Sequence, residues 1–402
     1  MESPLVLEAN ERTPELAPAS LKVRAQGVAA VAAKHASAVD LESRFPAEAF
    51  EAVKAQRLLG IFVPSSLGGE AASVADVADV CYQLAQGCAS TGMIYAMHQV
   101  KTACIVRHRH GSAALERLLR RLCAEQLLLA SSTTEGQGGG NVRSSEAAVE
   151  YADGRISLER RASVISYGAA ADGIVTTARR ADDAAASDQV LVAFLKSDYT
   201  LTPLQGWSTL GMRGTCSEGY ILKANGAAEQ ILPEPYESIH TQTMVPFAHL
   251  LWGSVWAGIA AGATARAQAF IRNASRHGSG QLPPGAAQFT RALASLRMLR
   301  GMLATALRTY ERSMHDPKLL ASLEFQSMIT LAKVEASETA VSIVLSALRA
   351  CGLSGYRCDG EFSIERYLRD VLSAPIMINN DRILANVMNS SLMTPVPAAL
   401  RD

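Results

Sequence analysis

The sequence predicts an α+β fold that is mainly α-helical, with helices at both ends of the chain and strands between them. Ala-rich segments without strand-type runs occupy residues 1–126, short β-type runs occupy 127–236, and apolar stripes with helical spacing follow in 237–402. These changes of pattern predict an N-terminal helical domain (1–126), a middle β domain of the sandwich or barrel type (127–236) and a C-terminal helical bundle (237–402).

The first domain is predicted to contain several helices separated by turns. Turn signals occur at 45–46 (Phe-Pro) and at 63–69 (VPSSLGG), since Pro and Gly interrupt helices. Residues 73–111 then fit two further helices that meet near 87–90.

The middle domain is predicted from β-type runs at roughly 10-residue spacing. The runs cover residues 154–165, 173–178, 189–196 and 220–223. The polar insert 181–188 separates two of them and is expected to form an exposed loop.

The last domain shows two apolar stripes at three- and four-residue steps, as expected for amphipathic helices. The first stripe consists of Phe289, Leu293, Leu296, Leu299, Leu303, Leu307, Tyr310 and Met314, and the second of Leu331, Val334, Val341, Leu345 and Leu348. Sustained stripes with short connections favour an antiparallel bundle.

Composition excludes several classes of protein. The 402 residues include 38 Lys+Arg and 38 Asp+Glu, which gives a formal net charge of zero, and 49% of them are hydrophobic. A chain with this apolar content and no net charge is not disordered, and it lacks the net positive charge of a nucleic-acid binder. The 7 Cys include no CxxC pair, so we expect neither a disulfide framework nor a metal site. The N-terminus has no signal peptide pattern, and a cytoplasmic location is expected.

Residues 241–265 contain no charged side chain and are long enough to span a bilayer. The stretch is rich in Ala, Gly and Thr, includes His249 and continues as a polar helical extension. We therefore predict a helix buried within the bundle and no membrane span.

Three local patterns suggest a binding site. Residues 130–142 (ASSTTEGQGGGNV) form a Gly-rich segment at the entry to the β domain, where backbone N–H groups can approach an anionic group. Residues 163–172 (SVISYGAAAD) end a strand and turn. The most specific pattern is 206–217 (GWSTLGMRGTCS).

At these residues the sequence resembles the acyl-CoA dehydrogenase superfamily, whose middle domain carries a GW…GMRGT signature. Residues 351–356 (CGLSGY) and 364–370 (IERYLRD) are similar to a run in the family's C-terminal domain, and 97–99 with 106–108 are similar to a segment of one bacterial branch. The resemblance implies a helical domain, a β-barrel and a four-helix bundle.

The resemblance also implies FAD, bound between the barrel and the bundle and completed by a neighbouring subunit, with FMN as the less favoured flavin. It implies a homotetramer built as a dimer of dimers. The residues that match the family's cofactor-binding positions are Thr134, Gly139, Gly140, Ser166, Arg276, Gln288, Arg349 and Gly352. Arg276 would reach the FAD pyrophosphate of a partner subunit, because guanidinium groups pair well with phosphate.

One family feature is missing. Dehydrogenases of this family use a carboxylate to remove the α-proton of a thioester, and the matching position here is Ile378. The alternative acid of some members falls at 250–252, which is Leu-Leu-Trp. Asp381 lies three residues after Ile378 and would serve only if the loop were shifted, so a surface or capping role is the simpler reading.

His98 and Ser166 are the other candidate catalytic residues. By resemblance His98 lines the acyl side of the flavin, where related monooxygenases use a histidine and a serine. A core or surface role is the more common one for a single helical histidine. His249 has a weaker claim, and His108 and His110 fit an exposed basic helix end.

Two activities and one non-enzymatic role follow. The first is an FAD-dependent dehydrogenation of an acyl thioester, with hydride transfer to flavin N5. The alternative is a flavin-dependent monooxygenase or oxidase that uses reduced flavin and oxygen. A flavin-binding homologue without catalysis ranks third. The partner implied is an acyl-CoA or another small-molecule substrate; the electron acceptor or flavin reductase is not indicated by the sequence.

Overall fold

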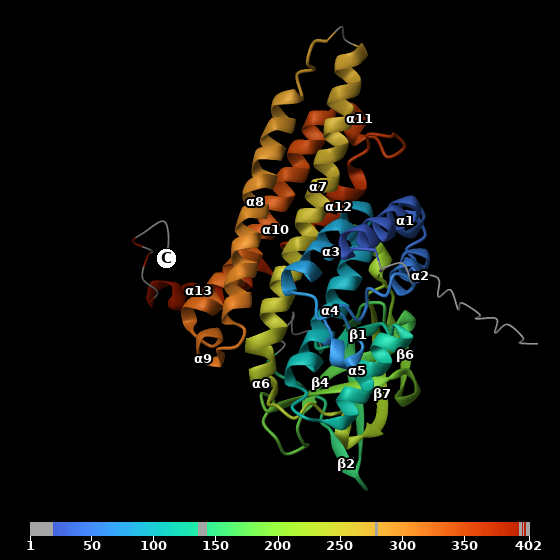
Figure 1. The fold of residues 1–402 in the computed structure, drawn as a ribbon, viewed down its shortest axis with the longest axis vertical. Coiled ribbons are helices and arrows are strands. Elements are labelled where there is room, and N and C mark those ends of the chain that lie inside the picture. The colour runs from blue at the N-terminus through green and yellow to red at the C-terminus, as the bar shows by residue number, and fades with distance from the viewer. Residues whose placement is uncertain (1–18, 136–142, 278–279, 394–395, 397, 399–402) are drawn as a thin grey trace, which may run out of the picture.

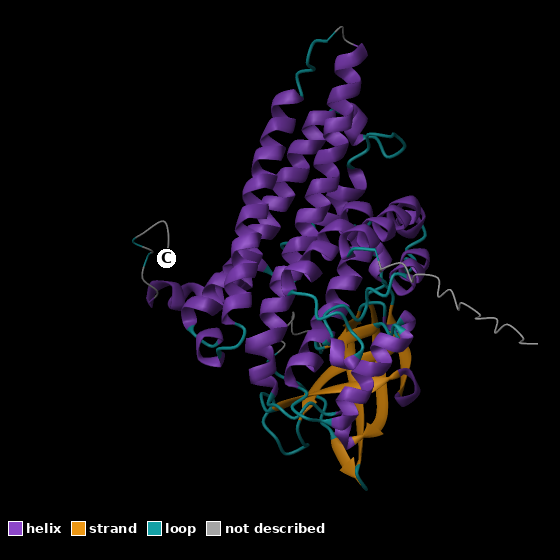
Figure 2. Cartoon of the chain, viewed as in Figure 1, coloured by secondary structure: helices purple, strands orange, loops and turns teal. Residues whose placement is uncertain are grey.

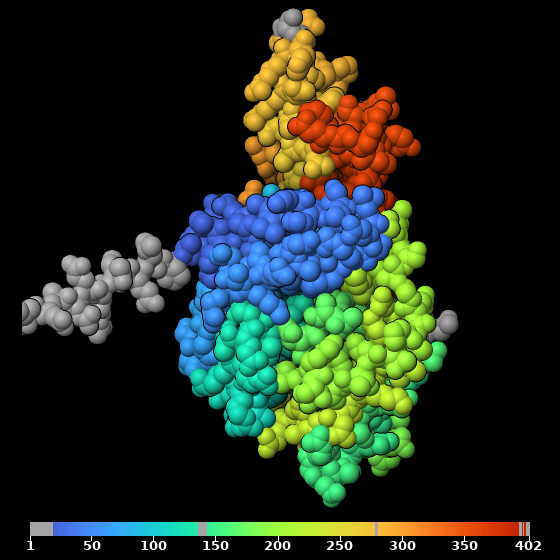
Figure 3. Space-filling view, turned by 90° about the vertical axis from the view of Figure 1, so that its right-hand side faces the viewer, coloured from blue at the N-terminus to red at the C-terminus, as the bar shows by residue number. Residues whose placement is uncertain are grey.

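The computed structural model describes residues 19–135, 143–277 and 280–393, together with 396 and 398. Helices at the start of the chain are followed by two small sheets and then by long helices (Figures 1 and 2). The predicted class, mainly helical with a β region in the middle, is confirmed. In the space-filling view the N-terminal helices form a layer between the bundle and the β region (Figure 3).

The N-terminal helices are α1 (Leu21–Leu41), α2 (Ala47–Ala55), α3 (Val74–Gly87), α4 (Ala89–His108) and α5 (Ala113–Glu125). A capping box begins α3: Ser73 Oγ accepts from the backbone N–H of Asp76, whose carboxylate accepts from the Ser73 N–H (both 3.0 Å). The predicted break near 87–90 is confirmed, because α3 ends at Gly87 and α4 begins at Ala89.

The strands form two sheets in the middle of the chain, where the sequence predicts a sandwich or barrel. The strands are β1 (Leu129–Ser132), β2 (Glu150–Ala152), β3 (Arg155–Ile165), β4 (Gly173–Arg179), β5 (Gln189–Leu195), β6 (Tyr199–Gln205) and β7 (Glu218–Ala227). One sheet has the order β1-β4-β5 and the other β2-β3-β7-β6. An isolated bridge between Glu135 and Ala162 joins the two sheets. The four predicted runs are confirmed as β3, β4, β5 and β7, whereas β1, β2 and β6 were not predicted.

The C-terminal helices are α6 (Tyr236–Ile239), α7 (Val245–His277), α8 (Ala286–Ser313), α9 (Pro317–Leu320), α10 (Leu323–Cys351), α11 (Leu353–Tyr356), α12 (Glu365–Val371) and α13 (Asn380–Met393). A π-helical turn (His240–Met244) connects α6 to α7. The two predicted stripes lie on α8 and α10. Three long helices, α7, α8 and α10, run side by side (Figure 1), and the shorter α12 and α13 contact α10 in the described part of the chain.

The uncharged stretch forms most of the π-helical turn and the buried first part of α7, as predicted for a buried helix. One segment of the described chain, Tyr236–His277, is long and apolar enough to cross a bilayer, but 94% of its most apolar window is buried inside the protein. Small residues permit this packing. A Cβ on Gly258 would lie 2.4 Å from the carbonyl oxygen of Tyr82, so glycine is needed where α7 crosses α3.

The signature at 206–217 folds into a loop that is tied to one carbonyl group. The carbonyl oxygen of Met212 accepts hydrogen bonds from Trp207 Nε1 (3.1 Å) and Thr215 Oγ1 (2.8 Å). Met212 itself has a left-handed backbone (φ 54°), which these bonds stabilise. The tryptophan and threonine of the signature therefore serve to fix the shape of the loop.

This loop packs directly against α12. Asp370 Oδ1 accepts the backbone N–H of Met212 (2.6 Å), and Arg369 donates to the carbonyl oxygen of Leu210 (2.9 Å). A Cβ on Gly211 would lie 2.2 Å from the carbonyl oxygen of Arg369. Two motifs that are far apart in the sequence are thus one structural unit.

We predict that Asp370 gives stability an unusual pH dependence. Burial raises the pKa of Asp370 to about 6. Because the pKa is higher in the folded than in the unfolded chain, this residue favours folding below about pH 4, and that contribution is lost as the pH rises through about 6. Asp370→Asn keeps an acceptor for the Met212 N–H but does not titrate.

The measurement is urea unfolding of both proteins at several pH values between about 4 and 7. Between the pKa of Asp370 in the unfolded chain and that in the folded chain, Asp370→Asn should become more stable relative to the natural protein as the pH rises. The gain in relative unfolding free energy should be up to about 1.4 kcal/mol per pH unit. A difference that is constant with pH, or that moves the other way, would contradict the assignment.

Candidate active-site cavity

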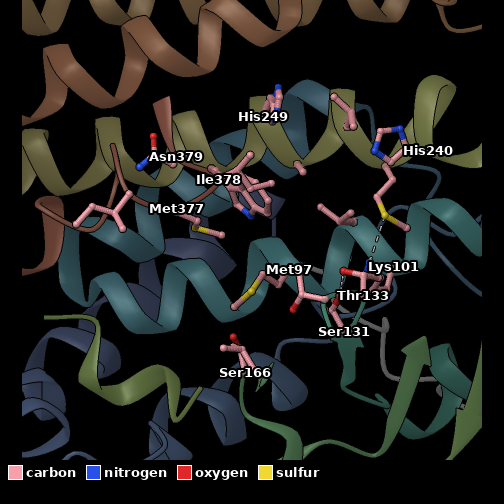
Figure 4. A pocket seen from close by; sticks show the side chains of 18 of the residues that line it. Met97, Lys101, Ser131, Thr133, Ser166, His240, His249, Met377, Ile378 and Asn379 are labelled. Carbon is pink, nitrogen blue, oxygen red and sulfur yellow. Dashed lines mark hydrogen bonds between the residues drawn. The ribbon is translucent and has the colours of Figure 1, made fainter. Parts of the chain in front are cut away.

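A cavity of about 620 Å³ lies where the helices meet the β region (Figure 4). Its volume is in the range of small-molecule sites. The lining residues come from α4, β1 and the residues after it, β3, the α7 region and the segment before α13. They are Met97, Val100, Lys101, Ser131, Thr133, Thr134, Ser163, Val164, Ser166, His240, Met244, Val245, Ala248, His249, Trp252, Ile376, Met377, Ile378 and Asn379.

The π-helical turn before α7 brings His240 and Met244 to the cavity wall. Such turns place side chains differently from a regular helix and are frequent at functional sites. Burial lowers the pKa of His240 to about 4, with Arg143 and Lys101 acting in the same direction. The imidazole is therefore neutral at pH 7 and can bind a ligand only by hydrogen bonding or contact.

Ser166 lies on the cavity wall at the end of a chain of hydroxyl groups. Thr215 donates to the carbonyl oxygen of Met212, so it must accept from Ser217 (2.7 Å). Ser217 must then accept from Ser166 (2.8 Å). The hydroxyl proton of Ser166 is therefore donated to Ser217, and the oxygen of Ser166 can accept a hydrogen bond from a ligand.

Ile378 occupies the position at which the family resemblance implies a catalytic acid. It lines the cavity with a left-handed backbone (φ 47°), a costly conformation for a β-branched residue. Its neighbour Asn379 uses its side-chain oxygen to accept the N–H groups of Asp381 (2.8 Å) and Arg382 (3.2 Å). No carboxylate occurs among the described residues that line this cavity.

Asp381 does not reach the cavity. It is exposed in the first turn of α13, where a negative charge interacts favourably with the helix N-terminus. The structure thus places the residue where the simpler reading expected it, and it offers no route to a ligand in the cavity.

Lys333 holds the segment that carries Ile378. It is fully buried on α10, and its ammonium group donates to the carbonyl oxygens of Ile378 (2.9 Å) and Ala374 (3.3 Å) and to Asn380 Oδ1 (2.7 Å). Three acceptors match its three N–H donors. The charge of Lys333 is thus used to fix one wall of the cavity, including its strained residue.

His98 lies outside the cavity lining, contrary to the expectation that it faces the flavin. It is 0% exposed, and Nε2 lies 2.9 Å from the carbonyl oxygen of Leu59 while Nδ1 accepts the N–H of Leu129 (3.0 Å). Nε2 therefore carries the proton. Burial lowers the pKa of His98 to about 4. Both ring nitrogens connect the N-terminal helices to β1, so the geometry supports a structural role.

Among the other candidate histidines, His110 is exposed as expected, whereas His108 is not. His249 lines the cavity, and burial lowers its pKa to about 3, so it is neutral. His108 is buried and not exposed as predicted: Nδ1 lies 2.5 Å from Glu234, Nε2 lies 2.7 Å from Thr243, and burial lowers its pKa. His110 also contacts Glu234.

The Gly-rich segment is only partly described. Thr134 lines the cavity as the resemblance implies, whereas Gly139 and Gly140 lie outside the described residues. Glu135 turns away from the cavity. Its carboxylate accepts the N–H of Ala147 (3.2 Å) and lies 3.6 Å from Arg160.

The remaining predicted cofactor residues lie at the other end of the bundle. Arg276 is exposed at the end of α7, Gln288 begins α8, and Arg349 and Gly352 end α10. Arg276 follows His249 by 27 residues of continuous helix, which is about 40 Å. The structure therefore separates these four residues from the cavity of the same chain.

Two lysines were missed at the sequence level. Lys101 lines the cavity and is 3% exposed, and Lys333 is 0% exposed. A signal existed for Lys101, because it is the single charged residue between Ser90 and Val106 in a helix that is otherwise apolar or neutral. For Lys333 the neighbouring Glu335 and Glu338 suggested an ordinary solvated face.

Comparisons with known proteins agree with this fold. The models "Acyl-CoA dehydrogenase, N-terminal domain" and "Acyl-CoA dehydrogenase, C-terminal domain" match residues 22–126 and 241–393. A Mycobacterium tuberculosis protein named "Probable acyl-CoA dehydrogenase FadE25" is 24% identical over 366 residues, which are 90% of this chain and 91% of that protein.

Solved structures of monooxygenases share the same architecture. FMN-bound TdsC from Paenibacillus sp. A11-2, a dibenzothiophene monooxygenase, is 18% identical with a TM-score of 0.81 and covers 94% of this chain and 98% of its own. The methanesulfinate monooxygenase MsuC from Pseudomonas fluorescens is 16% identical with a TM-score of 0.80 over the same shares of the two chains.

We predict that Lys333→Met loosens the cavity wall. The substitution keeps the length of the side chain but leaves three buried acceptors without a donor, which should cost about 2–4 kcal/mol in unfolding free energy. Hydrogen exchange in 374–380 should also become faster. Lys223→Met removes an exposed lysine and should change stability by less than about 0.5 kcal/mol. Unchanged exchange in 374–380 would show that Lys333 does not hold this segment.

Proposed function

We propose that this member of the acyl-CoA dehydrogenase family, which is a flavin-dependent oxidoreductase, acts as a flavin-dependent monooxygenase. The observation that carries the proposal is the absence of an acid from the described cavity lining. Dehydrogenation of a thioester requires a base for the α-proton, and an isoleucine cannot supply one. Oxygen transfer from a reduced flavin has no such requirement.

The cavity suits a flavin because its two sides differ in chemistry. The β region contributes the hydroxyl-bearing residues Thr133, Thr134 and Ser166 to the lining, while the helices contribute the apolar surface of Met97 and Trp252. A planar ring with polar edges needs both kinds of contact. When bound in its reduced form, the flavin supplies two electrons to oxygen, so that one oxygen atom enters the substrate and the other leaves as water.

The direction of the hydroxyl chain supports a reduced flavin. Ser166 can only accept a hydrogen bond from a ligand, since its own proton goes to Ser217. A reduced flavin carries an N–H at N5, which an oxidised flavin lacks. Ser166 is therefore proposed to orient that edge of the ring, which agrees with its matching position in the family.

The walls of the cavity are proposed to keep water away from the reacting atoms. Met97, Trp252, Met377 and Ile378 close the space with apolar side chains. His240 and His249 are neutral at pH 7 and do not draw in counter-ions. Exclusion of water limits side reactions of oxygen with the reduced cofactor. The names of two structural neighbours, TdsC and MsuC, give further support for oxygen chemistry on this fold.

The first test is anaerobic mixing of the oxidised holoenzyme with butyryl-, octanoyl- and palmitoyl-CoA. We expect no loss of the visible flavin absorbance, because the described cavity lining holds no carboxylate to remove the α-proton. The same enzyme, reduced and then mixed with oxygen, should show a transient absorbance that differs from both the oxidised and the reduced flavin. Bleaching by any of the thioesters would overturn the proposal in favour of dehydrogenation.

A matched variant guards against failure of the thioester to bind. Ile378→Glu places a carboxylate on the same wall of the cavity. Bleaching in this variant, together with none in the natural protein, would show that the thioester enters and that only the acid is missing.

The flavin is proposed to be FAD shared between subunits of a homotetramer. Arg276 lies about 40 Å along α7 from the cavity, too far to contact a flavin bound in its own chain. Arg276, Gln288, Arg349 and Gly352 could together contact the dinucleotide of a second subunit. A separate reductase is proposed to deliver the electrons.

The second test compares FAD and FMN retention. Arg276→Ala should weaken FAD binding about tenfold, as expected for the loss of one guanidinium–phosphate contact, and leave FMN binding unchanged. Arg272→Ala, one turn earlier on the same exposed end of α7, is the control. Equal affinity of the natural protein for the two flavins would reject the FAD assignment.

A further inference from the structure

Lys101 is a buried cation that faces the cavity without an anionic partner. The side chain is 3% exposed, and its ammonium group has one hydrogen-bond contact among the described residues, with Met244 Sδ at 3.5 Å (Figure 4). A thioether is a weak acceptor, so most of the hydrogen-bonding capacity of the ammonium group is unused. A buried charge in this state is costly unless a ligand completes it.

Among the described residues, the surroundings of Lys101 do not supply the missing negative charge. The ionisable groups that act on it are Cys104 and Arg160, and the latter adds positive charge. Burial lowers the pKa of Lys101 to about 8, so the ammonium form still predominates at pH 7. Lys333, the other buried lysine, differs because its three donors are all satisfied within the protein.

The position of Lys101 divides the cavity into two ends. In Figure 4, Lys101 lies with Thr133 and His240 toward one end, while Met377 and Ile378 lie toward the other. Ser131 and Thr133 add hydroxyl groups close to the lysine end, where their oxygens are 3.5 Å apart. The space between the ends is lined mainly by apolar side chains.

We infer that Lys101 binds the anionic group of the substrate, a carboxylate or a comparable oxyanion attached to an apolar body. This inference rests on the proposed function, since it assigns a substrate class to the same cavity. The ammonium group would bind the oxyanion with help from the hydroxyl group of Thr133, and the apolar body would extend toward Ile378. Charge-assisted hydrogen bonds in a buried site are strong enough to determine which ligand is accepted.

The reduced flavin is a second possible source of negative charge in this cavity. If Lys101 served the flavin, its removal would change the reduction potential of the flavin but not the choice of ligand. If Lys101 serves the substrate, its removal changes the choice of ligand and leaves the reduction potential of the bound flavin, measured without substrate, nearly unchanged. The two roles are therefore separated by measuring both quantities in the same variants.

The experiment uses the oxidised holoenzyme with hexanoate, hexanamide and 1-hexanol, which differ in the charge of the head group. Binding is followed by calorimetry and by the change in flavin absorbance. The natural protein should bind hexanoate at least about tenfold more tightly than 1-hexanol. Lys101→Met should abolish this preference, Lys101→Arg should retain most of it, and the exposed control Lys223→Met should leave it intact.

Three results would overturn the inference: no preference for hexanoate in the natural protein, an unchanged preference in Lys101→Met, or a shifted flavin potential in Lys101→Met with the preference retained. Lys101→Gln provides a second neutral variant if Lys101→Met does not fold. Ligand binding is measured without oxygen transfer, so the two proposals can fail separately. A preference for hexanoate supports the inference about Lys101 even if the oxygen experiment shows no monooxygenase chemistry, and that second result alone rejects the proposed function.

Discussion

The hydrogen bond from the backbone of Met212 to Asp370 and the ion pair of the adjacent Arg369 together join the three parts of the molecule. Asp370 belongs to α12, Met212 to the signature loop of the β region, and the adjacent Arg369 pairs with Asp40 of α1 (2.5 Å). The segment that ends in Ile378 follows α12 directly, and the hydroxyl chain to Ser166 starts at Met212. This hydrogen bond therefore connects the chain segments that lead to Ser166 and to Ile378, and the glycine at 211 is required because the two backbones touch.

Two buried lysines give the cavity its distinctive character. Lys333 is saturated by carbonyl and amide oxygens and acts on the structure, since it fixes the strained backbone at Ile378. The ammonium group of Lys101 contacts the sulfur atom of Met244 among the described residues and is available to a ligand in the cavity. The two lysines differ in how many acceptors surround the ammonium group. An ammonium group has three N–H donors, and a buried donor without an acceptor is unfavourable. The same residue type therefore serves as a structural clamp in one place and as a ligand receptor in the other.

Much of the fold could be predicted because its determinants are local. The stripes on α8 and α10 and the break between α3 and α4 depend on spacing and on single turn residues. The functional side chains could be predicted less well, because their roles depend on partners from distant segments. His98 is satisfied by Leu59 and Leu129, which no helical pattern indicates. Strand spacing predicted a sandwich or barrel without deciding between them, and in the described residues the strands form two sheets with an isolated bridge between Glu135 and Ala162.

The missing acid and the orientation of Ser166 are independent observations that favour the same chemistry. Ile378 lies where the family resemblance places a catalytic acid, and the described lining of the cavity holds no carboxylate that could take a proton from carbon. The hydroxyl chain adds the second condition, because a serine that can only accept matches a cofactor that carries a proton at its edge. In the proposed function, a described lining without carboxylates and with a neutral His240 and His249 would limit the access of water to the reduced cofactor, and the cation at Lys101 would orient an anionic substrate. These features together fit oxygen transfer better than proton abstraction.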